Sequence, residues 1–489
     1  MKRHKLYIRT ISMIFVVCLL LCGCQQSPEN DIIVNPDSTG VKEGDYTKQN
    51  ADSNGSTTII NESFDSTDGS VHFELDFQTD SSVSSLPTVV VEPHYFSEED
   101  AKRVANVLFG NAEFYEREPY ASATFSKSEI QERLERWSQY VNNEALSELY
   151  GTDDISYIQG LVQEYILKYT LKQETVSDGN VHTICEWKFK EESRYTFSED
   201  NITQEELDND NSAIMVNCSV NGINYCLDIV TRNKSDYKLN VITAYIDGSN
   251  SPFGIDEAIA RANLCRTEKP NQTQIDAILK KTEYILNAID LGQWAIDSYV
   301  LQEGIIGEQV EYIIQINALP VLEGAKATDC SSFFESKENS YASNYYLSNV
   351  KMEFAPDGTL LSFELTSPID ILEVSGQTEV TSTIDTMIER AKEILSLSDW
   401  NAFYTSTSKD LSKESVVCNV SITQGYFGLV RTKVKDQDNQ YQYIPAFILT
   451  GTYELTNFET GKMYMYKDSP GIILALNVSN GAIIVSPGA

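Results

Sequence analysis

Histidine is scarce in this sequence, with only four among 489 residues. His4 lies in a basic N-terminal segment, which leaves His72, His94 and His182 for any site. The sequence has no H-E-x-x-H pair, no G-x-S-x-G elbow, no P-loop and no G-x-G-x-x-G fingerprint. Zinc-protease, serine-hydrolase and nucleotide chemistry therefore lack their motifs. We predict no catalytic residue, no metal site and no cofactor.

Positive charge is also scarce, because 37 Lys and Arg stand against 72 Asp and Glu, a formal net charge of -35 at pH 7. Binding to phosphate backbones requires clustered basic residues, so we expect no nucleic acid partner. Hydrophobic residues make up 41% of the chain, too many for a wholly disordered protein. A length of 489 residues exceeds what one core of roughly 250–300 residues accommodates, so we expect more than one folded unit.

Long apolar runs are missing as well. Residues 11–22 form an apolar run that follows four basic residues, but 12 residues are too few to span a bilayer, which needs about 20. A basic segment followed by a short apolar run is typical of an export signal. The run ends in Leu21, Cys22, Gly23 and Cys24.

These four residues resemble the lipobox of bacterial lipoproteins, in which signal peptidase cuts before a cysteine. The resemblance implies that residues 1–23 are a signal peptide and that Cys24 carries a diacylglycerol anchor and palmitate-type acyl chains. It places the protein on the outer face of the cell membrane. Cys22 is less usual than Ala or Ser at its position, and an ordinary signal peptide is the alternative. A strongly acidic chain is repelled by anionic headgroups, so the lipid anchor is expected to provide the membrane attachment.

Residues 24–82 are rich in Ser, Asn, Asp, Thr and Gly, and we expect an acidic flexible tether. One stretch inside it, residues 71–77, alternates strictly between apolar and polar residues, which predicts an edge strand docking on the body.

The rest divides into a first unit, residues 83–250, and a second unit, residues 251–489. In the first, Ser97 and Ser126 are expected to begin helices, and a third helix is expected over residues 155–169. Strands follow, the first of them over residues 181–189, where apolar and polar residues alternate. The dipeptide Asn221-Gly222 predicts a hairpin. In the second, helices are expected over residues 256–265, 272–289 and 383–397, and strands over residues 294–301, 309–319, 347–354 and 359–366 and through much of residues 416–484. The predicted class is α+β, with helices followed by antiparallel β-meanders in two units.

Residues 284–294 resemble residues 390–400, since each ends an amphipathic helix and then reaches a tryptophan. Either the two segments record an internal duplication or the similarity is chance.

Six cysteines remain after the signal region, and none has zinc-site spacing. They form either up to three disulfides or buried thiols, and we favour thiols because most lie in apolar strand runs. The Asn221-Gly222 turn sets Val220 opposite Ile223, so Cys218 and Cys226 point to opposite faces and do not pair.

Weaker patterns are better explained by chance or by ordinary surface structure. Three S-x-x-K matches lack their partner motifs. Two Asp/Asn-rich loops lack the distal glutamate of a calcium site. Rows of tyrosines, including Tyr441 with Tyr443, suit sugar stacking or a half-buried sheet. Sequence alone does not choose a carboxylate pair for glycoside hydrolysis.

Two strand–turn–strand passages, residues 352–360 and 475–484, resemble small exported PepSY-like modules, which implies binding to envelope proteins. As a whole the chain resembles an uncharacterised family of large Gram-positive lipoproteins, which supplies no catalytic residues to carry over. We expect a non-enzymatic, lipid-anchored extracytoplasmic protein that binds an envelope protein or glycan. The alternatives are a solute-binding lipoprotein of a transporter and a carboxylate-dependent glycan hydrolase.

Overall fold

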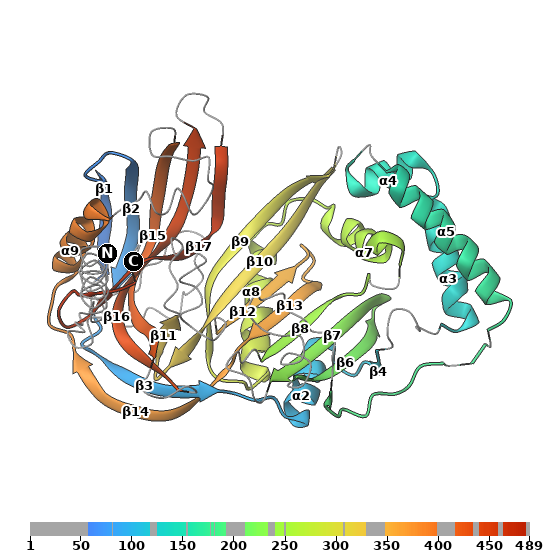
Figure 1. Ribbon diagram of the computed structural model, residues 1–489, viewed down its shortest axis with the longest axis horizontal. Helices are drawn as coiled ribbons and strands as arrows, with labels where there is room; N and C mark the ends of the chain where they lie inside the picture. Colours follow the sequence, from blue (N-terminus) through green and yellow to red (C-terminus); the bar gives the residue numbers. More distant parts are fainter. Residues whose placement is uncertain are drawn as a thin grey trace, which may run out of the picture.

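The computed structural model describes most of the chain after residue 56. The described residues are 57–80, 82–117, 125–152, 155–176, 178–179, 181–191, 211–232, 240–248, 251–306, 309–328, 348–398, 416–433, 440–457 and 463–485. The expected signal and lipobox, including Leu21, Cys22, Gly23 and Cys24, lie outside them. Figure 1 shows two β-rich lobes and a separate group of helices at one end.

The first lobe, here the terminal lobe, combines strands from both ends of the chain with one helix. Its elements are β1 (Thr57–Asp65), β2 (Val71–Asp80), β3 (Ser85–Pro93), β11 (Ala325–Thr328), β14 (Ile369–Glu379), α9 (Ile384–Leu397), β15 (Val416–Lys433), β16 (Tyr441–Asn457), β17 (Met463–Asn477) and β18 (Ile483–Val485). Most neighbours pair antiparallel, but β15 pairs parallel with both β2 and β11. The sheet is therefore mixed.

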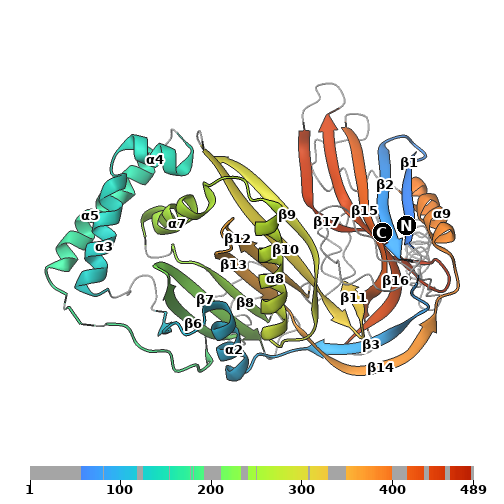
Figure 2. The ribbon, with the colours of Figure 1, turned by 180° about the vertical axis from the view of Figure 1, so that it is seen from behind.

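The second lobe, here the central lobe, is built around one antiparallel sheet. Its elements are α2 (Glu98–Phe109), β4 (Tyr115–Glu116), β5 (Lys190–Glu191), β6 (Asn211–Val220), β7 (Ile223–Arg232), β8 (Val241–Ile246), α7 (Ile255–Cys265), α8 (Gln272–Ala288), β9 (Trp294–Ile306), β10 (Gln309–Leu322), β12 (Asn349–Phe354) and β13 (Leu360–Thr366). Figure 2 shows α2 and α8 lying across one face of this sheet.

Three helices form a block beyond the central lobe: α3 (Lys127–Trp137), α4 (Asn143–Tyr150) and α5 (Ser156–Gln173). Their buried side chains, among them Trp137 and Val162, pack together with Ile255 and Ile259 of α7. The block is thus joined to the body through α7.

The predicted fold class is wrong. The described chain is mostly β, with strands linked into one large mixed sheet, rather than two units of helices followed by meanders. Pairing is non-local: Val71 of β2 lies opposite Cys418 of β15, and β8 pairs with β13. Sequence periodicity indicates where strands occur but does not indicate which distant strands they join.

Two of the expected boundaries lie close to described strands. The hairpin of β1 and β2 occupies part of the segment expected to be a tether, and it contributes Phe73 and Phe77 to the terminal core. The expected boundary between residues 250 and 251 falls inside the sheet that β8 and β13 share. The α8–β9 and α9–β15 successions are each helix followed by strand, and the internal duplication stays a prediction.

The terminal core buries the alternating face of β2 against α9 and the long strands. Val71, Phe73, Leu75 and Phe77 are each at most 1% exposed, as the alternation of residues 71–77 requires. Phe73 stacks on Phe64 of β1, with ring centroids 4.7 Å apart. The strand predicted over these residues is present, with partners on both sides rather than at an edge.

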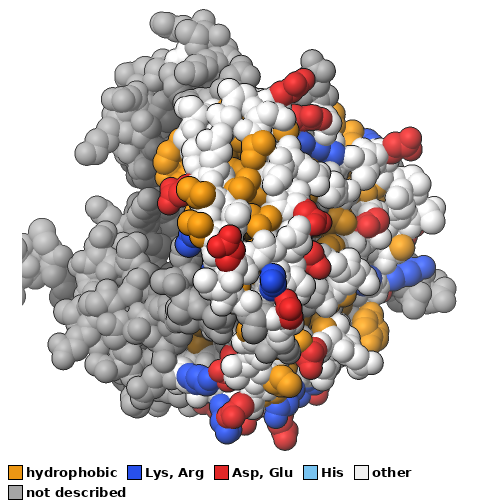
Figure 3. Space-filling view, turned by 90° about the vertical axis from the view of Figure 1, so that its right-hand side faces the viewer, with side chains coloured by type: hydrophobic (Ala, Val, Ile, Leu, Met, Phe, Trp, Pro, Cys, Tyr) orange, Lys and Arg blue, Asp and Glu red, His pale blue; other side chains and the backbone are white. Residues whose placement is uncertain are grey.

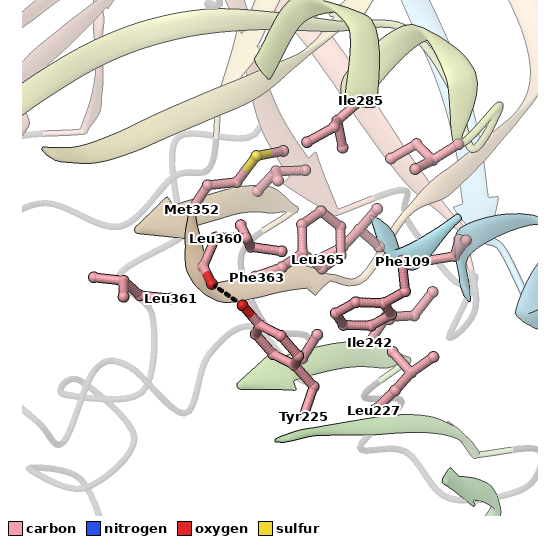
Figure 4. Packing of buried hydrophobic residues seen from close by; sticks show 14 of the residues in the cluster. Phe109, Tyr225, Leu227, Ile242, Ile285, Met352, Leu360, Leu361, Phe363 and Leu365 are labelled. Atoms are coloured by element: carbon pink, nitrogen blue, oxygen red, sulfur yellow. Dashed lines mark hydrogen bonds between the residues drawn. The ribbon is translucent and has the colours of Figure 1, made fainter. Parts of the chain in front are cut away.

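The central core lies between the antiparallel sheet and the two helices that cover it. Figure 4 shows Phe109 of α2 and Ile285 of α8 facing Leu227, Ile242 and other buried side chains of the strands. Tyr225 is buried among them, and its hydroxyl donates to the carbonyl oxygen of Leu360 at 2.8 Å. Packing therefore continues across the pairing of β8 with β13.

The turn predicted from the dipeptide Asn221-Gly222 is confirmed. The Asn221-Gly222 turn has positive φ at both residues and sets Val220 opposite Ile223 and Cys218 opposite Tyr225, as expected. The strand expected over residues 181–189 is wrong: the described part of that segment holds only an isolated bridge at Ile184 before β5. Neither α4 nor β14 was predicted from the sequence.

Candidate functional site

A two-stranded ribbon of β3 and β14 leads from the terminal lobe to the central lobe. Where it ends, His94 follows β3 and its Nδ1 lies 3.0 Å from both carboxylate oxygens of Asp370 on β14. The backbone N–H of His94 donates to the carbonyl oxygen of Pro368, and Asn240 donates to the carbonyl oxygen of His94, each at 2.8 Å. The end of the ribbon is therefore hydrogen-bonded to Asn240, just before β8, and to Pro368, just after β13.

The other ring nitrogen of His94 faces the first turn of α2. Its Nε2 lies 3.4 Å from Oδ2 of Asp100, which also accepts from the Ser97 hydroxyl at 2.6 Å and from the Ser97 backbone N–H at 2.8 Å. Burial acts to raise the pKa of Asp100, but the hydrogen bonds from Ser97 and Arg103 outweigh it and hold this pKa below 3.8. Asp100 is thus the ionised N3 residue of a capping box, in which Ser97 is the N-cap of α2.

Arg103 carries the same chain of contacts to the end of α8. It pairs with Asp100, and its Nε donates to the carbonyl oxygen of Ile289 at 2.7 Å. Its Nη2 donates to the carbonyl oxygen of Asp290 at 3.2 Å. The contacts therefore link Asp370 on the ribbon to the loop that begins at Asp290.

Between these two points lies a cavity of about 580 Å³, here the junction cavity, lined by residues 290–294, 320–324 and 369–371. The three segments are the loop before β9, the turn between β10 and β11, and the start of β14. The backbone N–H of Val321 donates to the carbonyl oxygen of Gln293 at 2.8 Å, which joins two of the walls. A volume of this size is typical of a small-molecule site.

The lining of the junction cavity is apolar at its base and acidic at its rim. Leu291 and Leu322 are buried, and Trp294 is half-buried. Three carboxylates, Asp290, Glu323 and Asp370, are exposed. Among the residues that line the cavity there is no Lys, Arg or His.

The remaining two histidines bind carboxylates elsewhere. His72 Nδ1 lies 2.7 Å from Asp65, and His182 Nε2 lies 2.7 Å from Glu129. Each of the three histidines after the signal region is thus paired with an acid. In the described part of the chain, no group of three or more His, Cys, Asp or Glu is placed to hold a metal ion.

The described cysteines are free thiols, as the apolar strand runs led us to favour. Cys218, Cys226, Cys265 and Cys418 are buried, and burial raises the pKa of each thiol to about 12. A thiol with so high a pKa is a poor nucleophile at neutral pH. Cys330 lies outside the described residues.

Other predicted features fall into three groups. Tyr441 and Tyr443 are buried, at 5% and 1% exposure, so this pair does not offer a stacking surface. Ser348 immediately precedes strand β12, as expected of a chance S-x-x-K match. The other S-x-x-K matches and the second Asp/Asn-rich loop, residues 436–439, lie outside the described residues. So does another row of tyrosines, Tyr341, Tyr345 and Tyr346. Of the first Asp/Asn-rich loop, residues 208–212, only residues 211 and 212 are described.

A smaller cavity of about 300 Å³ adjoins Asp256 where the helical block meets β7. The Asp256 carboxylate accepts from Arg133 and Arg136 at 2.8 Å each and from the indole N–H of Trp137 at 3.0 Å. Three donors leave this carboxylate little capacity for a ligand. We infer that these contacts hold the helical block to α7, which carries Asp256.

The outer side of the block carries exposed apolar side chains. Tyr157, Leu167, Leu171 and Phe253 are each more than half exposed. Figure 3 shows hydrophobic side chains gathered on this end of the molecule. Among the described helices, none is both long and apolar enough to cross a bilayer.

No protein-family model matches the chain, and no curated protein matches it. A solved structure of an uncharacterized protein from Eubacterium rectale is similar over 90% of this chain and 95% of its own, with 9% sequence identity and a TM-score of 0.36. A TM-score this low carries no argument about fold or function.

Sequence reasoning missed the junction cavity, because its three walls come from segments with no shared motif. Asp290, Glu323 and Asp370 are three of 72 acids, and nothing in the spacing marks them. The only local signals are turn residues, Gly292 and Gly324, both with positive φ.

Proposed function

We propose that this chain is a lipid-anchored extracytoplasmic protein that binds an envelope or surface partner without catalysis, and that the junction cavity is its binding site. The observation that carries the proposal is the cavity itself, which lies between the two lobes and is lined by an indole and three carboxylates. The sequence Leu21-Cys22-Gly23-Cys24 supports the anchor.

The arrangement of the acids favours binding over hydrolysis. Asp370 is held by His94 through both oxygens, so it is committed to the junction of the lobes. His94 has a carboxylate at each ring nitrogen, which leaves neither nitrogen in contact with a nucleophile. The solute-binding alternative requires βαβ lobes, whereas the described strands pair mostly antiparallel.

The anchor is tested by labelling cells with radioactive palmitate. The wild type and a Cys22→Ala control are expected to take up label, and Cys24→Ala is not. Label retained in Cys24→Ala would overturn the lipobox assignment.

Binding at the cavity is tested by placing a photo-cross-linking amino acid at Gln293, an exposed lining residue, in intact cells. A discrete adduct is expected, weakened by Glu323→Asn in the same chain. The matched position Gln377 on β14 is exposed, lies outside the cavity and should give none. Equal adducts from both positions would contradict the proposal. Release of sugars by the purified protein from peptidoglycan, abolished by Glu323→Gln, would favour the hydrolase alternative.

A further inference from the structure

We propose that the ligand of the junction cavity is an organic cation, a primary ammonium group carried on an alkyl chain such as a diamine or a lysine side chain. This inference rests on the proposed function, because it names the chemistry of the partner at the same site. It follows from what the cavity offers to a ligand.

The side chains of the cavity offer hydrogen-bond acceptors and few donors. Ionised Asp290, Glu323 and Asp370 only accept hydrogen bonds. The indole N–H of Trp294 is already used, because it donates to the carbonyl oxygen of Leu291 at 2.9 Å. Gln293 is the lining side chain that retains a donor. A carboxylate or phosphate ligand would find repulsion here, whereas an ammonium group brings three donors.

Two basic side chains of the contact chain beside the cavity already have partners. His94 binds Asp370 and Asp100, and Arg103 binds Asp100 and the carbonyl oxygens of Ile289 and Asp290. These contacts engage Asp370 and Asp100, whereas no basic residue lines the cavity beside Glu323. The carboxylates of Asp290 and Glu323 are exposed and stand at the ends of two turns that border the same space.

The apolar part of the lining selects for a cation with a hydrocarbon chain. Leu291 and Leu322 are 3% and 4% exposed, and Ile371 is 45% exposed at the start of β14. An alkyl chain would cover such a surface, while an inorganic cation would not. The face of an indole also attracts ammonium groups.

The probe for the test is 1,5-diaminopentane, with 1,5-pentanediol and glutarate as matched neutral and anionic controls, titrated into the full chain by calorimetry. We expect saturable binding of the diamine, weakened by added salt, and at least tenfold weaker binding of both controls. Equal binding of the diol or of glutarate would overturn the proposal.

Glu323→Asn is the sharpest variant. Glu323 has φ of 51°, a conformation that Asn adopts more readily, so this substitution removes the carboxylate without straining the turn. We expect Glu323→Asn and Asp290→Asn each to weaken diamine binding about three- to fivefold, the size of an exposed ion pair. Because a chain of charge -35 attracts cations generally, Glu379→Gln at the far end of β14 is the control and should leave the affinity unchanged. Equal weakening by Glu379→Gln would show diffuse attraction and reject the site.

The two proposals fail differently. If the adduct from Gln293 forms in cells and the diamine does not bind, the binding function stands and the ligand class is wrong. If neither forms, both proposals are rejected.

Discussion

Val71 of β2 and Cys418 of β15 lie opposite each other in a parallel pairing, although they come from opposite ends of the chain. Both are buried, at 1% and 0% exposure. The N-terminal hairpin is therefore an integral layer of the terminal lobe, and its side chains should contribute to the stability of the C-terminal strands.

Phe73→Ala tests this role. Phe73 is 0% exposed, so its truncation should lower the free energy of unfolding by about 3–5 kcal/mol, through lost burial and an unfilled cavity. Glu74→Ala, at the exposed neighbouring position, should change it by less than about 0.5 kcal/mol. Denaturant unfolding measures both. Equal, small effects would mean that residues 71–80 belong to a flexible tether after all.

Asp100→Asn should show a pH-dependent cost. The pKa of Asp100 lies below its ordinary 3.8, so the ionised form stabilises the folded state above that pH, and this contribution is lost as pH falls through the folded-state pKa. We expect the variant to be about 1 kcal/mol less stable than wild type at pH 7, the value of a typical helix cap.

The difference should begin to shrink at about pH 4, where the carboxyl of the unfolded chain takes up a proton, and should vanish at lower pH, where the folded-state carboxyl is also neutral. Glu99→Gln, at an exposed acid of the same turn, should give little difference at either pH. A gap between Asp100→Asn and wild type that stays constant to pH 2 would contradict the assignment of Asp100 as an ionised residue of the capping box.

Asp256→Ala should loosen the helical block. It leaves Arg133, 8% exposed, without its carboxylate, and breaking such a buried pair costs about 3–5 kcal/mol. Hydrogen exchange in α3 and α5 should rise, while exchange in the terminal lobe stays unchanged. Glu132→Ala, at an exposed position of α3, is the control. Unchanged exchange in α3 would show that Asp256 does not hold the block.

Gly451→Ala should be destabilising by about 1–3 kcal/mol or more. A Cβ at this position would overlap the carbonyl oxygen of Ser421 on the neighbouring strand β15. Gly376→Ala on β14 meets nothing within 4 Å and should be tolerated. Thermal unfolding compares the two, and a harmless Gly451→Ala would mean that β15 and β16 approach less closely.

The buried thiols should resist alkylation in the folded protein. Cys226 and Cys418 are 0% exposed, and burial raises the pKa of each to about 12. Iodoacetamide at pH 8 followed by peptide mass spectrometry should modify half-buried Cys185 first and these two only after denaturation. Rapid modification of Cys226 in the native state would contradict the described packing.

Sequence patterns predicted those parts of the fold that depend on neighbouring residues. Ser97 and Ser126 begin helices with capping boxes, and the Asn221-Gly222 turn fixes the register of β6 and β7. Each signal acts within about four residues, so no knowledge of the rest of the chain is needed.

The sequence did not predict which distant strands pair with one another. The alternation of residues 71–77 predicted a strand, but only the structure shows β15 beside it. β14 is exposed on both faces, so it lacks the alternation that marks a half-buried strand. The alternation of residues 181–189 was misleading, because Trp187 has φ of 53° and interrupts any extended run.

The parallel pairing of β2 with β15 also affects when the terminal sheet can be completed during folding. A chain is synthesised from its N-terminus, so the residues of β1 and β2 are made long before residues 418–422. During that interval the edge of β2 presents unpaired backbone groups and the side chains of Phe73 and Leu75, which invites pairing with other chains. Contacts so far apart in sequence also form slowly. The last strands to be made thus complete a sheet that the first strands began.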